Sequence, residues 1–220
     1  ARILLGATIV YLMVGLAFLS GKEDPDSAQG GLARQVAFLL LGGLAVPLIL
    51  ANWRRALLIV GRMWAILLAY CAMFATVFWS AFPGSTVRRF IVYLIVLLVA
   101  VGVSSALRNP RQFIVPVVVG STIVLFANLG FTVLFPVDAW SDIGLEALHT
   151  SKNVAGMVAQ AMAIVFAASL IALRQPLAFW TVAFLMLLAL FFMVLTISKT
   201  ALALTVLCVF ALIPAMVLIY

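Results

Sequence analysis

The stretch QPLAFWTVAFLMLLALFFMVLTIS, residues 175–198, contains no charged side chain and lies between Arg174 and Lys199. A helix needs roughly 20 residues to cross the hydrocarbon core of a bilayer, so this stretch is long enough to span a membrane. Seven more uncharged stretches are also long enough: residues 3–21, 35–53, 63–87, 90–107, 112–137, 153–173 and 200–220. We therefore predict an all-α, polytopic integral membrane bundle with about eight transmembrane helices.

The composition supports a membrane protein and excludes a soluble one. Hydrophobic residues make up 67% of the chain and charged residues 9%, which leaves too few polar side chains to cover a soluble surface. Only helices and closed barrels satisfy the backbone in lipid, and the continuous apolar runs are unlike the alternating strands of a barrel. We treat residues 1–220 as one transmembrane domain.

The charges divide sharply between alternate loops. The loops after the second, fourth and sixth stretches contain bases and no acid: Arg54, Arg55, Arg62, Arg108, Arg111 and Arg174. The other face carries all the acids: Glu23, Asp24, Asp26, Asp138, Asp142 and Glu146. The positive-inside rule predicts that the basic face and the N-terminus, with Arg2, are cytoplasmic. This topology accounts for seven of the thirteen basic residues, so the net charge of +7 does not indicate nucleic-acid binding.

Six cations lie on the acidic, external face. Lys22 and Arg34 flank the acids of its first loop, and membrane insertion does not require the other four: Arg88, Arg89, Lys152 and Lys199. A cation at the depth of Lys199, between apolar runs, is energetically unfavourable and indicates a functional site. Lys152 precedes an expected helix, whose N-terminus favours an anion. A lipid diphosphate at the outer membrane face is the partner that these cations fit best.

Each of these residues also has a simpler interpretation. Arg88 and Arg89 would snorkel to external head groups, and Lys199 would be an interfacial anchor. The nearby His149, the single histidine of the chain, would be a polar group of its loop rather than a base.

Lys152 has its own simpler interpretation, a surface ion pair with Glu146 or Asp142 that contributes little to stability. Cys71 and Cys208 lie inside apolar stretches, where they are typical packing residues. One histidine and two separated cysteines do not provide the ligands of a metal site, so we expect no metal.

Three external segments resemble the O-antigen ligase and polymerase family, which includes related exopolysaccharide polymerases. FWSAFPGSTVRRF, residues 78–90, is similar to the family's Trp-Ser, Pro, then Arg entry into a span. HTSKNVAG, residues 149–156, is similar to a His-Lys-Asn-x-x-Gly segment. TISKTALALT, residues 196–205, is similar to a Ser-Arg segment that opens a helix. Here Thr150 and Ser151 separate the histidine from the lysine, and Lys199 stands where arginine is usual.

The resemblance implies a metal-independent membrane glycosyltransferase without a cofactor, at the periplasmic face of a bacterial inner membrane. Its donor is a glycan on undecaprenyl diphosphate, and its acceptor is a hydroxyl of a lipid, a growing polysaccharide or a protein. Arg88, Lys152 and Lys199 would contact the diphosphate, with Arg89 and His149 in support. Asn153 and Gly156 are expected to shape the helix start rather than to touch the donor.

The family also has a large periplasmic loop with a catalytic histidine, followed by further helices. We expect these features beyond Tyr220, so that residues 1–220 are a fragment that binds the donor but lacks the catalytic base. The alternatives are a transporter or lipid-linked glycan flippase, and a noncatalytic membrane subunit. The uncharged stretches contain no acid or histidine for ion coupling, which favours the glycosyltransferase.

Overall fold

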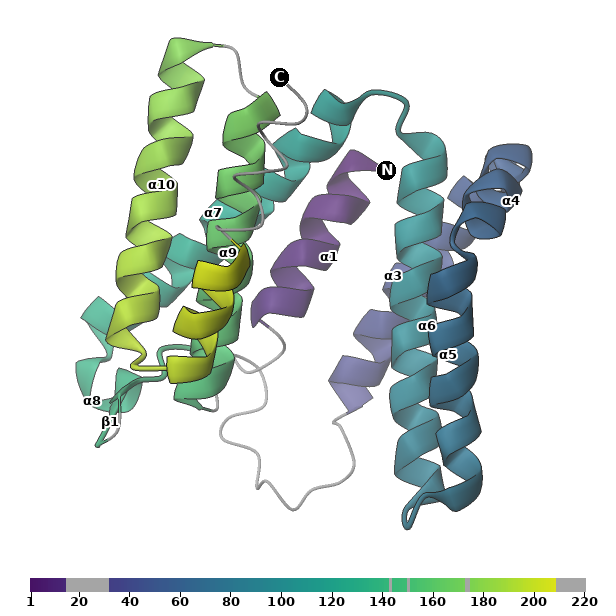
Figure 1. Ribbon diagram of the computed structural model, residues 1–220, viewed down its shortest axis with the longest axis horizontal. Helices are drawn as coiled ribbons and strands as arrows, with labels where there is room; N and C mark the ends of the chain where they lie inside the picture. Colours follow the sequence, from purple (N-terminus) through teal and green to yellow (C-terminus); the bar gives the residue numbers. More distant parts are fainter. Residues whose placement is uncertain (15–31, 143, 150, 173–174, 209–220) are drawn as a thin grey trace. The chain divides into compact units, whose positions relative to one another are not determined.

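The computed structural model describes residues 1–14, 32–142, 144–149, 151–172 and 175–208, and the described chain is all-α apart from one short hairpin (Figure 1). It forms two compact units, each described by itself below. The first contains residues 1–8 and 23–113, and the second contains residues 9–22 and 114–220.

Four helices are long and apolar enough to cross a membrane, which supports the prediction of an integral membrane protein. They are α6 (Pro83–Ala106), α7 (Pro110–Leu134, of which Gln112–Leu134 qualifies), α9 (Lys152–Ala172) and α10 (Pro176–Leu195). A fifth span is obtained if α3 (Leu32–Ala51) and α4 (Trp53–Arg62) are counted together. Among the described residues, the eight spans that we predicted are therefore not confirmed.

The other predicted spans correspond to shorter helices. These are α1 (Arg2–Val14), α5 (Trp64–Ala75) with the 3-10 helix η1 (Thr76–Trp79), and the helix Lys199–Cys208. Residues 15–21 and 209–220, which complete the first and last predicted spans, lie outside the described residues. The uncharged stretch 63–87 contains the end of one helix and the start of the next, because η1 ends at Trp79, the backbone at Ser80 is extended and α6 begins at Pro83. Proline fits this first helical position because its missing N–H has no partner there anyway.

In the first unit, α3 and α6 run parallel in close contact. A Cβ added to Gly42 of α3 would lie 3.2 Å from Cγ2 of Ile95, and one added to Gly102 of α6 would lie 3.0 Å from the carbonyl oxygen of Ala45. Small residues allow this approach, as is typical of helix pairs in membranes. The residue numbers increase together along both helices, so α3 and α6 point in the same direction.

The basic loop that we predicted after the second span is mostly helical. Residues 53–62 form α4, which is bent by 106° from α3. The bend occurs at Asn52, whose backbone is not helical and whose Nδ2 donates to the carbonyl oxygen of Leu48 at 3.1 Å. The sequence suggested a loop because three arginines interrupt the apolar pattern.

The second unit is built on α7, α9, α10 and the helix Lys199–Cys208. The helices α9 and α10 pack against each other along their length. Their shared core includes the fully buried Met162, Phe166 and Phe192, together with Leu125 of α7.

The connection between α7 and α9 folds onto one end of this core. It contains α8 (Pro136–Ala139) and an antiparallel hairpin of β1 (Trp140–Ser141) and β2 (Gly144–Leu145). Ala139 and Leu145 are fully buried, and the backbone N–H of Glu146 donates to the carbonyl oxygen of Ala139 at 2.9 Å. This connection, which the sequence marked only as a long loop, is therefore part of the packed unit.

Candidate functional site

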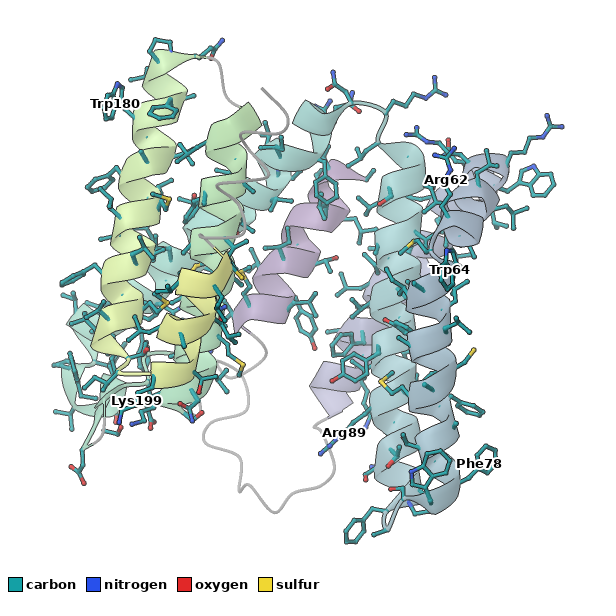
Figure 2. The ribbon with its side chains drawn as sticks, viewed as in Figure 1. Arg62, Trp64, Phe78, Arg89, Trp180 and Lys199 are labelled. Carbon is teal, nitrogen blue, oxygen red and sulfur yellow. The ribbon has the colours of Figure 1, made fainter. Side chains whose placement is uncertain are left out.

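The second and third motif segments lie at the same end of the second unit. Helix α7 ends at Leu134 and α10 ends at Leu195, whereas α9 begins at Lys152 and the last helix begins at Lys199. Figure 1 shows α8, β1 and the turn after α10 together at this end, and Figure 2 shows Lys199 there, opposite the end of α10 that carries Trp180. The prediction that these two segments share a face is supported within this unit.

Two glycines allow the segments to touch. A Cβ on Gly156 would lie 2.5 Å from Cβ of Ser198, and a Cβ on Gly144 would lie 2.7 Å from the carbonyl oxygen of Thr196. Real Cβ atoms do not approach other atoms so closely, so any other residue would push the turn at 196–198 away. Gly144 also has a φ of 145°, which L side chains rarely adopt. We had expected Gly156 to shape the helix start, and its contact is with the turn after α10.

A hydrogen bond joins the same segments. The hydroxyl of Ser198 donates to Oδ1 of Asn153 at 3.4 Å, and the Ser198 side chain is 2% exposed. The start of α9 is also capped, because the N–H of Val154 donates to Oγ of Ser151 at 3.4 Å. The first turn of α9 is thus fixed both along its own chain and against the turn after α10.

The two lysines flank this bond. Lys152 immediately precedes Asn153 and is half-buried, and its Cδ lies 3.5 Å from the position of a Cβ on Gly144. Lys199 immediately follows Ser198 and is exposed at the first position of its helix. Each cation therefore begins a helix, and the first turns of those helices meet through Asn153 and Ser198. The N–H groups of a first helical turn attract anions, and the two cations add charge at that place.

The turn that carries Lys199 is strained. Ile197 has a φ of 53°, in the left-handed region that a β-branched residue rarely enters. Such a conformation costs on the order of 1–3 kcal/mol and persists only where the surroundings impose it. Here the N–H of Ile197 donates to the carbonyl oxygen of Val194 at 3.1 Å, and Oγ1 of Thr196 donates to that of Met193 at 2.7 Å. Directly after Ile197, Ser198 is buried and Lys199 is exposed.

His149 differs in character from the lysines. Its side chain is 9% exposed, and burial lowers its pKa to about 4, so it is neutral at physiological pH. In the part of the chain that the structure describes, its Nε2 has no hydrogen-bond partner. His149 thus contributes no positive charge to the site, but its ring can still exchange a hydrogen bond with a ligand group. A pKa of about 4 is also low for a general base near pH 7.

The sequence did not mark Asn128, which supports this loop from α7. The side chain is fully buried, its Nδ2 donates to the carbonyl oxygen of Val124 at 2.9 Å, and its Oδ1 accepts a long hydrogen bond of 3.5 Å from the N–H of Leu148. The sequence did contain a signal for Asn128, which is a polar amide within an apolar span. A buried polar group in a membrane needs a hydrogen-bond partner.

Arg88 and Arg89 lie in the first unit, in the second turn of α6, and both are exposed. The turn before them is held by a 2.7 Å hydrogen bond between the hydroxyls of Ser80 and Thr86. Figure 2 shows Arg89 and Phe78 on opposite sides of the α5–α6 hairpin. Phe78, with Trp79 and Phe82, forms a group of exposed aromatic side chains, as is typical at a membrane–water interface.

Among the described residues, no group of three or more histidine, cysteine or acidic side chains is placed to hold a metal ion. The chain matches no protein-family model, and no curated protein or solved structure is significantly similar to it.

Proposed function

We propose that the chain belongs to a membrane glycosyltransferase of the O-antigen ligase and polymerase type, acting in cell-surface polysaccharide synthesis. The enzyme transfers a glycan from an undecaprenyl diphosphate carrier to a hydroxyl acceptor at the periplasmic face of a bacterial inner membrane. The observation that carries this proposal is the contact between the second and third motif segments, at Gly156 and Ser198. Residues 45 positions apart, Asn153 and Ser198, are also hydrogen-bonded there.

The chemistry of the donor explains why fixed cations belong at this place. The acceptor oxygen attacks the anomeric carbon of the sugar, and the C1–O bond to the diphosphate breaks. The bonding electron pair leaves with undecaprenyl diphosphate, and the acceptor proton passes to a base. Cations held in position stabilise the negative charge that grows on the leaving diphosphate.

The residues take different parts in this scheme. Lys152 and Lys199 contact the diphosphate, and the N–H groups of the two helix starts supplement them. Arg88, with Arg89 in support, stays a phosphate contact expected from the sequence, because both residues lie in the first unit. His149 is a neutral hydrogen-bonding group that lies close in sequence to Lys152. The burial and low pKa of His149 support a binding role rather than that of the base.

A transfer assay with the full-length protein tests the proposal. Lys199→Ala removes a charge-assisted contact of about 1.5–3 kcal/mol, so transfer from an undecaprenyl diphosphate donor should fall roughly 10- to 100-fold. Lys199→Arg should retain most of the activity, because it keeps the charge and can still bind phosphate. The matched control is Arg108→Ala, which removes an exposed cation that has no role in the proposed site.

Transfer by Lys199→Ala at the wild-type rate would contradict the proposal. A flippase is the rival outcome. A flippase would move the lipid-linked glycan across the membrane of reconstituted vesicles and leave the bond between glycan and diphosphate intact. Assays of glycan movement and of glycan transfer on the same reconstituted protein distinguish the two activities.

A further inference from the structure

Helix α4 has a direction and a length that do not fit a membrane span. It has ten residues, so it is about 15 Å long and cannot cross a hydrocarbon core of about 30 Å. It is bent by 106° from α3, which runs parallel to the candidate span α6. If α3 and α6 cross the membrane, α4 lies close to the membrane plane.

The depth of α4 follows from the packing of α3. The last turns of α3 contact α6 near its end, because Ile49 lies 3.4 Å from the position of a Cβ on Gly102 and α6 ends at Ala106. α4 begins two residues after α3 ends and also packs against α6. It therefore lies at the level where the span α6 ends, which is the boundary between hydrocarbon and head groups.

The surface of α4 is suited to that boundary. Ala56 is buried against the first unit, whereas Trp53, Leu57 and Leu58 are more than half exposed. At 100° per residue, the three arginines lie within an arc of about 100° that also contains the exposed Leu58, and Trp53 and Leu57 form an apolar strip about 60–100° from Arg54. A helix with one apolar and one cationic strip is typical of elements that lie in the membrane interface.

The charge of α4 selects one kind of partner. Its three charged residues, Arg54, Arg55 and Arg62, are all basic. The chain has no acidic residue between Asp26 and Asp138, so the arginines have no acidic neighbour in the sequence that forms α3 to α6. Arginine binds phosphate oxygens well, and a row of arginines at a membrane surface attracts anionic lipids.

We propose that α4 is an in-plane helix that binds anionic phospholipid head groups through Arg54, Arg55 and Arg62 while Trp53 and Leu57 enter the acyl boundary. This lipid site is separate from the diphosphate site of the second unit. It does not depend on the proposed glycosyltransferase activity.

Fluorescence of Trp53 in the reconstituted full-length protein tests the proposal. Trp64, Trp79, Trp140 and Trp180 are the other tryptophans of these 220 residues, and they are replaced by Phe, as is any tryptophan elsewhere in the protein. Quenching of Trp53 by brominated phosphatidylglycerol, in competition with unlabelled phosphatidylcholine, gives the relative binding constant of the anionic lipid. We expect a preference of at least about fivefold, which corresponds to the contribution of about 1 kcal/mol from a single cation near an anionic surface.

Two variants and a control separate charge from structure. Changing all three arginines to Gln should lower the relative binding constant of the anionic lipid to less than about twofold over phosphatidylcholine (Arg54→Gln, Arg55→Gln and Arg62→Gln). Changing the same three positions to Lys should keep the preference. Arg2→Gln, which removes an exposed cation of α1, should leave it unchanged. A relative binding constant near one in the wild-type protein, a preference that survives the triple Gln change, or no quenching of Trp53 by brominated phosphatidylglycerol overturns the proposal.

Discussion

The hydroxyl of Ser198 donates a hydrogen bond to Oδ1 of Asn153 at 3.4 Å and so joins the starts of two helices that each begin with a lysine. The bond fixes the direction of both first turns at the end of the second unit. Lys152 and Lys199 are next to its two partners in the sequence, so any movement of this junction moves both cations.

Gly156→Ala should loosen the junction. Its new Cβ would lie 2.5 Å from Cβ of Ser198, so the turn at 196–198 must shift. Overpacking of this kind reduces stability by about 1–3 kcal/mol, which thermal unfolding of the detergent-purified protein would detect. Gly130→Ala in α7 is the matched control, since a Cβ there has no neighbour within 4 Å. Equal unfolding temperatures for the two variants would show that the contact at Gly156 does not constrain the turn.

Stability should decrease between about pH 6.5 and pH 4 because of His149. Burial lowers the pKa of this side chain in the folded protein to about 4, from an ordinary value of 6.5 in the unfolded chain. Between those values the unfolded state binds more protons, so stability falls as the pH falls, by up to about 3 kcal/mol at pH 4.

His149→Gln, which does not titrate, should remove this part of the pH dependence. The unfolding temperatures of both proteins are measured across this pH range. Both proteins have the same carboxylates, so the difference between the two curves gives the contribution of His149 alone. Parallel curves for the two proteins would mean that the imidazole is accessible to water.

Asn128→Leu should release the loop that contains His149. The N–H of Leu148 would lose its partner, and an unpaired buried amide costs about 1–3 kcal/mol. Hydrogen exchange at residues 144–149 should then become faster. Thr132→Val is the control, because it removes a hydrogen bond within α7 and leaves the loop amide paired. If the exchange rates at residues 144–149 are the same in Asn128→Leu as in the wild-type protein, apolar packing alone holds the loop in place.

Single cysteines should report the topology. With Cys71 and Cys208 replaced by Ser, together with any cysteine outside these 220 residues, an impermeant thiol reagent added to intact cells should label positions 24 and 142 and leave 108 and 174 unlabelled. The reason is that the acid-free basic loops are retained on the cytoplasmic side. Labelling at 108 or 174 instead would reverse the orientation, and the cations that we assign to the site would become ordinary topology signals.

The sequence predicted those parts of the fold that depend on hydrophobicity over many residues. Helices α6, α7, α9 and α10 each contain most of an uncharged stretch, because one long apolar run is enough to indicate a helix. Helix α4 was missed because it is short and its arginines resemble a basic loop. The start of α6 at Pro83 was placed too late, because Pro83 and Gly84 are also typical of turns.

The residues of the candidate site were proposed from the sequence, whereas its geometry could not be. The charges of Lys152 and Lys199 could be recognised from their place beside apolar runs. The bond between Asn153 and Ser198 and the left-handed Ile197 depend on packing between distant segments, which no local pattern contains. The burial of His149, which makes it neutral, has the same origin.

Binding of the lipid carrier is the most direct test of the central claim that the junction at Lys152 and Lys199 holds a diphosphate. Equilibrium binding of undecaprenyl diphosphate and of uncharged undecaprenol to the purified full-length protein should show a preference for the diphosphate that weakens with salt. Lys152→Ala and Lys199→Ala should each reduce diphosphate affinity about 10- to 100-fold and leave undecaprenol binding unchanged, whereas Arg108→Ala should affect neither. Equal affinity for the two lipids, or wild-type diphosphate affinity in both lysine variants, would contradict the account.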